Sequence, residues 1–410
     1  MDAISRLNIV TNEVDIMQFE SFVEESRDWW DAYFRHIKQL DKEGRLYPKD
    51  RKFLYPNIIV ATQCKGYYLV ELMGAVRSYS TLVTKRHRED SIYRYLSQFD
   101  DGEPNPVVTF DSSNNALRFL CLSQKGMRDS ALARFPHLEL YQTKVRNVDG
   151  HGSVLAFGDK FRSCAIENCV LVNTRDQLVR CKGILWLGIL RNSVTRSELV
   201  DLFVKVTESG EIKGVHPTTR QRDARLTLAG QLQSMYLFPN LRETTLGEFF
   251  KLHPDVIKLA FKTDCFKYEP YLEWIEHDGT VTDEAINPDL LVQRPDGFFD
   301  IYDLKTALLD ITRITKGARN RRRFIEYVEE GVSQLANYRE YFRYPRNAAY
   351  AKDKYNVVVE NPKLVLVVGT FDNVDINEVE QACRKYKNVE IVDYDTLCQM
   401  FMGSPQDNDP

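Results

Sequence analysis

The sequence predicts an α/β protein, with a C-terminal half built as a mixed β-sheet flanked by helices and an N-terminal half of the α+β type. Three observations support this prediction. From Thr245 onward, helical and strand-like patterns follow one another in the order α–β–β–β–α–β–α–β–α. Residues 364–369 are apolar on both faces, which is typical of a central strand. Before residue 210, short strands and helices are mixed without such a regular order.

The composition is that of a globular protein. The chain has 410 residues, enough for two or three domains at the usual ~100–200 residues each. Its 43% apolar and 28% charged residues exclude a wholly disordered or collagen-like chain. The formal charge of −4 excludes a protein that is basic overall, so any contact with nucleic acid must come from a local patch.

Cysteine usage and the lengths of apolar runs indicate the compartment. The eight cysteines are scattered and form no CxxC pair, which favours reduced thiols over disulfides or a zinc site. No apolar run approaches the ~18 residues needed to span a bilayer. The first residues lack the basic and apolar regions of a signal peptide. We therefore expect a cytoplasmic protein.

A segment rich in helix breakers, ESGEIKGVHPTT at 208–219, predicts the main domain boundary. It divides the chain into residues 1–215, with one or two subdomains, and residues 216–410. The first region is expected to hold a helix over 19–42, strands over 58–61 and 67–72, a strand-rich stretch over 154–190 and a helix that a capping box of Thr195 and Glu198 opens. We expect a fragment from about residue 216 to fold on its own.

The second region carries the regular pattern. A helix over 220–235 is followed by a helix that a capping box of Thr245 and Glu248 opens and that Pro254 interrupts or restarts. The remaining expected elements are strands at 268–275, 289–293 and 298–305, a helix at 320–342, a strand at 364–369, a helix at 375–386, a strand at 389–392 and a helix at 394–401.

Residues 289–305 carry the most informative chemistry. The turn sequence RPDG at 294–297 separates two β-prone runs and predicts a hairpin. In a register centred on Asp296, Asp289 lies opposite Asp303, and Lys305 lies on the same face one repeat further along. Two carboxylates and one ammonium group therefore converge at the end of the hairpin. A slip of one residue would send the two aspartates to opposite faces.

This arrangement suits a divalent metal such as Mg²⁺, with Mn²⁺ as a substitute, because hard cations take carboxylate oxygens. The metal would polarise a phosphodiester and lower the pKa of a bound water. Lys305 would position that water, act as a base if its pKa is depressed, or stabilise developing charge. The alternative is two exposed aspartates beside a turn and a solvated lysine.

Three further features surround this motif. Glu248 is either a third acidic group of the site or only the N3 residue of its capping box. Gln334, one turn from Gly331 and Tyr338, is either an accessory residue of the site or a polar residue on a solvated helix face. A basic segment follows the Lys305 strand, where it can flank a phosphate or form a solvated face, and it contains Arg313, Lys316, Arg319, Arg321, Arg322 and Arg323.

The order of elements around Pro288-Asp289 and Asp303-Leu304-Lys305 resembles the core of the PD-(D/E)XK nucleases. Over about 235–402 the chain is similar to the Shedu type of antiviral nuclease, in EFF and HP at 248–254, QLANY at 334–338, LVLVVG at 364–369 and VEIVDYDTL at 389–397. One departure is Asp303, where family members commonly carry Glu.

The resemblance implies a metal-dependent DNA endonuclease that acts on double-stranded DNA, with residues 1–215 as a sensing or regulatory region. It implies that Asp289 and Asp303 hold the metal, that Glu248 completes the site, that Lys305 manages the water and that Gln334 assists. It also suggests a homotetramer. Two alternatives stay open: a repair or recombination nuclease with the same core, and a catalytically silent DNA-binding or assembly module.

Overall fold

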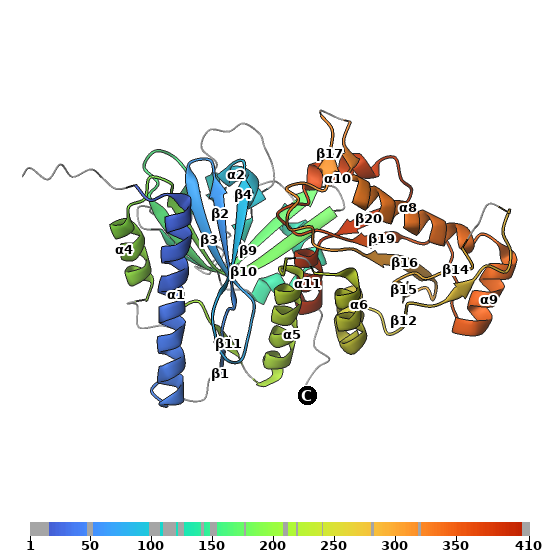
Figure 1. The fold of residues 1–410 in the computed structure, drawn as a ribbon, viewed down its shortest axis with the longest axis horizontal. Coiled ribbons are helices and arrows are strands. Elements are labelled where there is room, and N and C mark those ends of the chain that lie inside the picture. Colours follow the sequence, from blue (N-terminus) through green and yellow to red (C-terminus); the bar gives the residue numbers. More distant parts are fainter. Residues whose placement is uncertain are drawn as a thin grey trace, which may run out of the picture.

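The structure is a computed structural model that describes residues 16–46, 52–97, 107–109, 120–121, 127–140, 143–147, 154–175, 178–207, 212–218, 220–239, 241–279, 283–318 and 321–403. It has two halves that lie side by side, each built around its own β-sheet (Figure 1). Two long strands of the first sheet, β9 (Ser163–Arg175) and β10 (Leu178–Arg191), reach towards the second half.

The sheet of the N-terminal half has seven strands among the described residues, in the order β4-β2-β3-β10-β9-β6 with β7 paired to β9. Its strands are β2 (Ile58–Cys64), β3 (Tyr67–Met73), β4 (Val83–Glu89), β6 (Leu120–Cys121), β7 (Lys144–Asn147), β9 (Ser163–Arg175) and β10 (Leu178–Arg191). Two small pairs accompany it, β1 (Lys52–Leu54) with β11 (His216–Thr218) and β5 (Val107–Thr109) with β8 (Val154–Ala156). The expected strands over 58–61 and 67–72 are confirmed.

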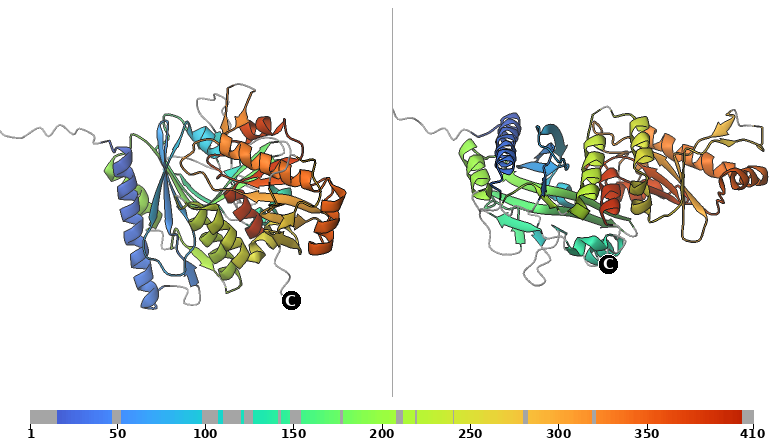
Figure 2. Two further views of the ribbon diagram at one scale, coloured as in Figure 1. Left: turned by 45° about the vertical axis from the view of Figure 1, so that its right-hand side comes forward. Right: turned by 90° about the horizontal axis from the view of Figure 1, so that it is seen from below.

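Helices α1 (Phe19–Lys42) and α4 (Arg196–Thr207) pack on this sheet through an aromatic core that includes Trp30, Phe34, Trp186 and Phe203. Both lie at the end of the molecule remote from the C-terminal half (Figure 2). The capping box at Thr195 is confirmed, because the amide of each of Thr195 and Glu198 donates to the other residue's side chain. Shorter helices, α2 (Ile92–Ser97), α3 (Met127–Arg134) and the 3₁₀ helix η2 (Pro136–Leu140), complete this half.

The sheet of the C-terminal half has five strands in the order β12-β15-β16-β19-β20 among the described residues. These are β12 (Phe266–Tyr268), β15 (Leu290–Gln293), β16 (Phe299–Leu304), β19 (Leu364–Val367) and β20 (Val389–Val392). The pairs β12–β15 and β15–β16 are antiparallel, whereas the pairs β16–β19 and β19–β20 are parallel. The expected mixed sheet is therefore present.

Helices cover both faces of this sheet (Figure 1). One face packs against α5 (Arg220–Tyr236), α6 (Glu243–Leu252), α7 (Pro254–Phe261) and α11 (Tyr394–Gly403). The other packs against α8 (Glu326–Tyr341) and α10 (Ile376–Cys383). At the outer end, α9 (Pro345–Tyr355) lies against the pair β13 (Leu272–Glu273) and β14 (Ala285–Ile286).

Three expectations about these elements are wrong, and one helix was not expected. Helix α6 begins at Glu243 with Arg242 as its N-cap, so Thr245 and Glu248 lie inside the helix and form no capping box. The strand expected over 268–275 is broken, because Glu269 adopts a positive φ and β13 pairs away from the main sheet. Helix α8 begins at residue 326, because β18 (Arg323–Phe324) pairs with β17 (Thr315–Lys316). Helix α9 was not expected, although Pro345 at its start is a known signal.

The two halves share a hydrophobic core. Ile58, Val60 and Met73 of the first sheet are buried in one cluster with side chains of α5, α6, α7 and α11. This packing does not fit the expectation that a fragment from about residue 216 folds on its own. No helix in the described ranges is both long enough and apolar enough to cross a membrane.

Candidate active site

The hairpin of β15 and β16 has the expected register. Val292 pairs with Asp300 and Leu290 with Tyr302, so that Asp289 and Asp303 are the next opposed residues. The turn closes with a hydrogen bond from the Gly297 amide to the Arg294 carbonyl, and Gly297 takes the positive φ that its position requires. The turn sequence therefore predicted which carboxylates meet.

Asp289 and Asp303 form a pair of carboxyl groups at the end of the hairpin, with Asp303 buried and Asp289 half-buried. Asp289 accepts a hydrogen bond of 2.6 Å from the Leu304 amide. Only 1% of Asp303 is exposed. Burial, together with the charge of Asp303, raises the pKa of Asp289 to about 7. Burial also raises the pKa of Asp303, although Lys305 beside it acts in the opposite sense.

Lys305 extends over the pair from the end of β16. Its Nζ lies 2.8 Å from Oδ2 of Asp303 and 3.7 Å from Oε2 of Glu243. Burial alone would lower the pKa of Lys305, but the neighbouring carboxylates outweigh it and raise that pKa above its ordinary value. Of the three roles that the sequence left open for Lys305, the raised pKa favours positioning the water or stabilising developing charge over acting as a base.

Helix α8 supplies a polar clamp for the ammonium group of Lys305. Lys305 donates to Oε1 of Gln334 at 3.1 Å, and Gln334 in turn donates to the Tyr338 hydroxyl. Gly331 makes room for this, since a Cβ there would lie 3.3 Å from Cε of Lys305 and 2.9 Å from Leu366. Gln334 is thus brought to the site as expected, and Gly331 leaves space for the side chains of Lys305 and Leu366.

The acidic residue of α6 that reaches this site is Glu243. Its side chain accepts a hydrogen bond from the Tyr327 hydroxyl and lies near Lys305, whereas Glu248 is exposed one and a half turns further along the helix. Sequence reasoning missed Glu243 because it placed the helix start three residues too late. An acidic residue in the first turn of a helix was the signal that pointed to it.

The carboxylate oxygens of this site suit a hard divalent cation that is bound by few protein side chains. Among the described residues, no three His, Cys, Asp or Glu side chains are grouped closely enough to form a metal site. The carboxyl groups of Asp289 and Asp303 remain, with the Lys305 ammonium beside Asp303. Mg²⁺ keeps several of its waters and is commonly bound through one or two carboxylates. Asp289 and Asp303 would thus hold it, without Glu248.

The carboxyl pair makes stability depend on pH. Because the pKa of Asp289 is raised in the folded state, the folded protein binds more protons than the unfolded chain between about pH 4 and 7, and stability falls as pH rises through that window. In EDTA, we expect Asp289→Asn to raise the free energy of unfolding by about 2 kcal/mol at pH 8 and by almost nothing at pH 4. Urea denaturation at both pH values measures this.

Asp296→Asn is the control for that measurement. Asp296 is an exposed turn residue, and a hydrogen bond from Arg294 lowers its pKa. Its replacement should cost a little stability at pH 8, so the two variants should differ in sign. Equal stability changes for Asp289→Asn at pH 4 and pH 8 would contradict the raised pKa of Asp289.

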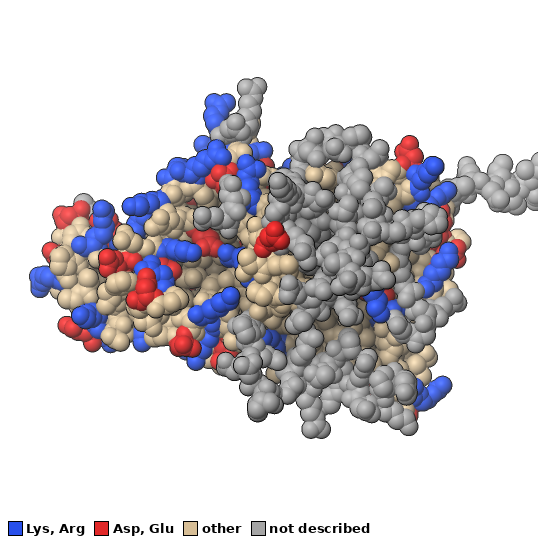
Figure 3. Space-filling view, turned by 180° about the vertical axis from the view of Figure 1, so that it is seen from behind, with Lys and Arg blue, Asp and Glu red and all other residues tan. Residues whose placement is uncertain are grey.

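The basic segment divides into two groups. Arg313 pairs with Glu89 at 2.7 Å, and Arg322 pairs with Glu378 at 2.8 Å, so both face protein. Lys316, Arg321 and Arg323 are exposed on the small hairpin of β17 and β18, and Arg319 lies outside the described residues. Lys and Arg side chains gather along the upper edge of this half (Figure 3). Among the described basic residues of this segment, only the second group is exposed to solvent.

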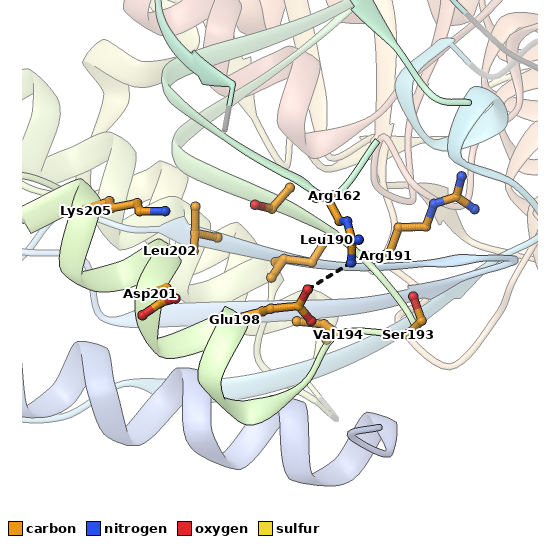
Figure 4. A pocket seen from close by; sticks show the side chains of 10 residues that line it. Arg162, Leu190, Arg191, Ser193, Val194, Glu198, Asp201, Leu202 and Lys205 are labelled. Carbon is orange, nitrogen blue, oxygen red and sulfur yellow. Dashed lines mark hydrogen bonds and ion pairs between the residues drawn. The ribbon is translucent and has the colours of Figure 1, made fainter. Parts of the chain in front are cut away.

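A separate hollow lies between β10 and α4 in the N-terminal half (Figure 4). It has a volume of about 220 Å³, and its walls include Arg162, Arg191, Glu198 and Lys205. Arg162 pairs with Glu198 at 3.1 Å, and Arg191 donates to the Phe161 carbonyl. These contacts already pair several of the charged groups that line the hollow.

Comparison with models of known protein families found no match, and no curated protein matches the sequence.

Proposed function

We propose that this protein is a metal-dependent DNA endonuclease with a PD-(D/E)XK core, similar to the Shedu type of defence nuclease. One observation carries the proposal: the hairpin of β15 and β16 brings Asp289, Asp303 and Lys305 together on one buried face. The motif resemblance stated above and the strand order β12-β15-β16-β19-β20, antiparallel then parallel, support it.

Each residue has a defined task in this proposal. Asp289 and Asp303 would hold Mg²⁺, or Mn²⁺ in its place, and the bound metal would polarise the phosphodiester and supply a water of lowered pKa. Lys305 places a positive charge where negative charge develops on the phosphate. Gln334 fixes the direction of the Lys305 side chain, and Glu243 with Tyr327 closes the site on the side of α6.

The test is incubation of the purified chain with supercoiled plasmid and with linear duplex DNA, in Mg²⁺ and in EDTA. We expect relaxed or linear products in Mg²⁺ only. Binding of DNA without cleavage would instead support a silent DNA-binding module. Phage plating with and without the gene separates a defence role from a repair role, and sedimentation of the intact protein tests the homotetramer that the resemblance suggests.

The exposed cations of the β17–β18 hairpin are expected to contact DNA phosphates. Arg323 lies four residues before Tyr327, which donates to Glu243 beside the site. Replacing Lys316, Arg321 and Arg323 by Ala should weaken binding of all DNA sequences alike. It should reduce the slope of log K against log salt by about 1 for each phosphate that the variant no longer neutralises.

Arg27 and Arg35 provide a control on α1, remote from the site. Their side chains are 42% and 65% exposed and form ion pairs with Asp28 and Asp31 of the same helix. Their replacement by Ala should leave the salt slope unchanged. A triple variant with the wild-type slope would show that the hairpin does not touch DNA.

A further inference from the structure

The loop that joins β19 to α10, residues 369–374 and here called the junction loop, touches the segment that directly follows Lys305. The Gly369 amide donates to the Thr306 carbonyl at 3.2 Å. The side-chain amide of Asn373 donates to the carbonyls of Ala307 and Leu308, both at 2.9 Å. The junction loop thus holds three consecutive backbone carbonyls beyond the candidate catalytic lysine.

A tyrosine next to this loop holds the carbonyl of Lys305 itself. The hydroxyl of Tyr394 donates to that carbonyl at 2.5 Å, and the Tyr394 amide donates to the Gly369 carbonyl at 3.1 Å. The Tyr394 ring is fully buried and stacks on Tyr236, with ring centroids 5.5 Å apart. The position of the Lys305 backbone therefore depends on the position of the junction loop.

The opposite side of the junction loop is held by an arginine of the N-terminal half. Arg180 of β10 donates to the carbonyls of Thr370 and Val374, and its guanidinium lies 4.8 Å from the ring centroid of Phe371. It also pairs with Asp393 at 2.8 Å. A guanidinium fits several oxygens in fixed directions, so this contact sets both the position and the orientation of the loop.

A buried lysine on the same strand adds a second link. Only 2% of the Lys182 side chain is exposed, and its Nζ lies 2.9 Å from Asp372 of the junction loop and 2.9 Å from Glu71 of β3. Tyr95 donates to Glu71 from the other side. Burial alone would raise the pKa of Asp372, but Lys182 and other cations lower it below its ordinary value. A buried ion pair of this kind favours one geometry of the junction.

We infer that Arg180 and Lys182, although they belong to the N-terminal half, are positioning residues for the Lys305 site. They act through the junction loop, which holds the carbonyls of residues 306–308 and contacts Tyr394, the residue that holds the Lys305 carbonyl. A displacement of β10 in the N-terminal half would thereby move the candidate catalytic lysine. The inference rests on the proposed function only for its effect on catalysis, because its effect on the backbone can be measured without DNA.

Asp372→Asn tests this inference in the full chain. It removes the charge that Lys182 holds in the loop and leaves the pair of Lys182 with Glu71 intact. The control is Glu167→Gln, which removes the partner of another buried lysine, Lys213, within the N-terminal half. The two pairs match: both have an N–O distance of 2.9 Å, the lysines are 2% and 1% exposed, and the carboxylates 17% and 14%.

The first readout is amide hydrogen exchange without DNA or metal. In Asp372→Asn we expect exchange in peptides covering 303–310 and 366–375 to rise about tenfold, with the rest of the C-terminal sheet unchanged. Glu167→Gln should leave both peptides unchanged. Arg180→Lys is a second variant, because lysine keeps the charge without the fixed geometry of a guanidinium, and it should accelerate the same two peptides.

The second readout is plasmid cleavage in Mg²⁺, with kcat and DNA affinity measured separately. Asp372→Asn should lower kcat about tenfold and leave the affinity for DNA unchanged. If the wild-type protein does not cleave DNA but the exchange pattern is as expected, the proposed function fails and the positioning role stands. Unchanged exchange in 303–310 in folded Asp372→Asn and Arg180→Lys, or equal acceleration throughout the molecule, would overturn the inference.

Discussion

The Asp303→Asn variant is expected to lose plasmid cleavage by at least about 1,000-fold while it stays folded. The loss follows because one of the two carboxylates that would hold the metal disappears, and ~4 kcal/mol of transition-state stabilisation corresponds to that factor. The fold should survive because Asn is close in shape and removes a charge that is buried beside Asp289. Single-turnover cleavage of supercoiled plasmid in Mg²⁺ measures the loss.

Asp300→Asn is the matched control on the same strand. Asp300 is also buried, but it faces away from Asp303 and accepts hydrogen bonds from Arg294 and from the Lys363 amide. Its replacement should leave the rate within about threefold of the wild-type rate, since no step uses it. Similar losses in both variants would mean that Asp303 acts only through stability, and wild-type cleavage in Asp303→Asn would remove it from the site.

A fragment of residues 216–410 is expected to fail to fold, in contrast to the expectation from sequence. Removal of the N-terminal half would take Ile58, Val60 and Met73 out of the hydrophobic cluster that they share with side chains of α5, α6, α7 and α11. It would also leave Asp393 without Arg180 and Asp372 without Lys182. Losing one partner of a buried ion pair typically costs ~3–5 kcal/mol, and a domain is stabilised by only ~5–15 kcal/mol.

Solubility and thermal unfolding followed by circular dichroism test this expectation. A fragment of residues 16–403 is the control, because it keeps both halves, and it should unfold cooperatively near the temperature of the full chain. A soluble 216–410 fragment that unfolds cooperatively and nicks plasmid in Mg²⁺ would show that the halves are independent.

The parts of the fold that could be predicted from sequence, in both halves, are those that local signals determine. The RPDG turn at 294–297 fixed the register of the hairpin, and that register alone placed Asp289 opposite Asp303. The helix over 19–42 and the capping box at Thr195 were likewise recognisable from side-chain spacing and from paired cap residues. Such features depend on neighbours a few residues away.

The features that sequence reasoning missed depend on contacts between distant segments. Arg313 was expected to contact DNA, but Glu89, more than two hundred residues earlier, pairs with it. Glu243 became part of the site because Tyr327 and Lys305 reach it from other elements. The predicted domain boundary at residue 215 rests on a change of sequence pattern. The shared hydrophobic core and the ion pair of Lys182 with Asp372 join residues on both sides of this boundary.

The central claim is that Asp289 and Asp303 hold a divalent metal beside Lys305. Its most direct test is a crystal structure of the full chain grown with Mn²⁺, with anomalous scattering measured at the manganese edge. The account predicts a peak about 2.1–2.2 Å from one oxygen of each carboxylate, with Lys305 still within hydrogen-bond distance of Gln334. A map without a peak between the two carboxylates at millimolar Mn²⁺, or with the peak at another site, would contradict it.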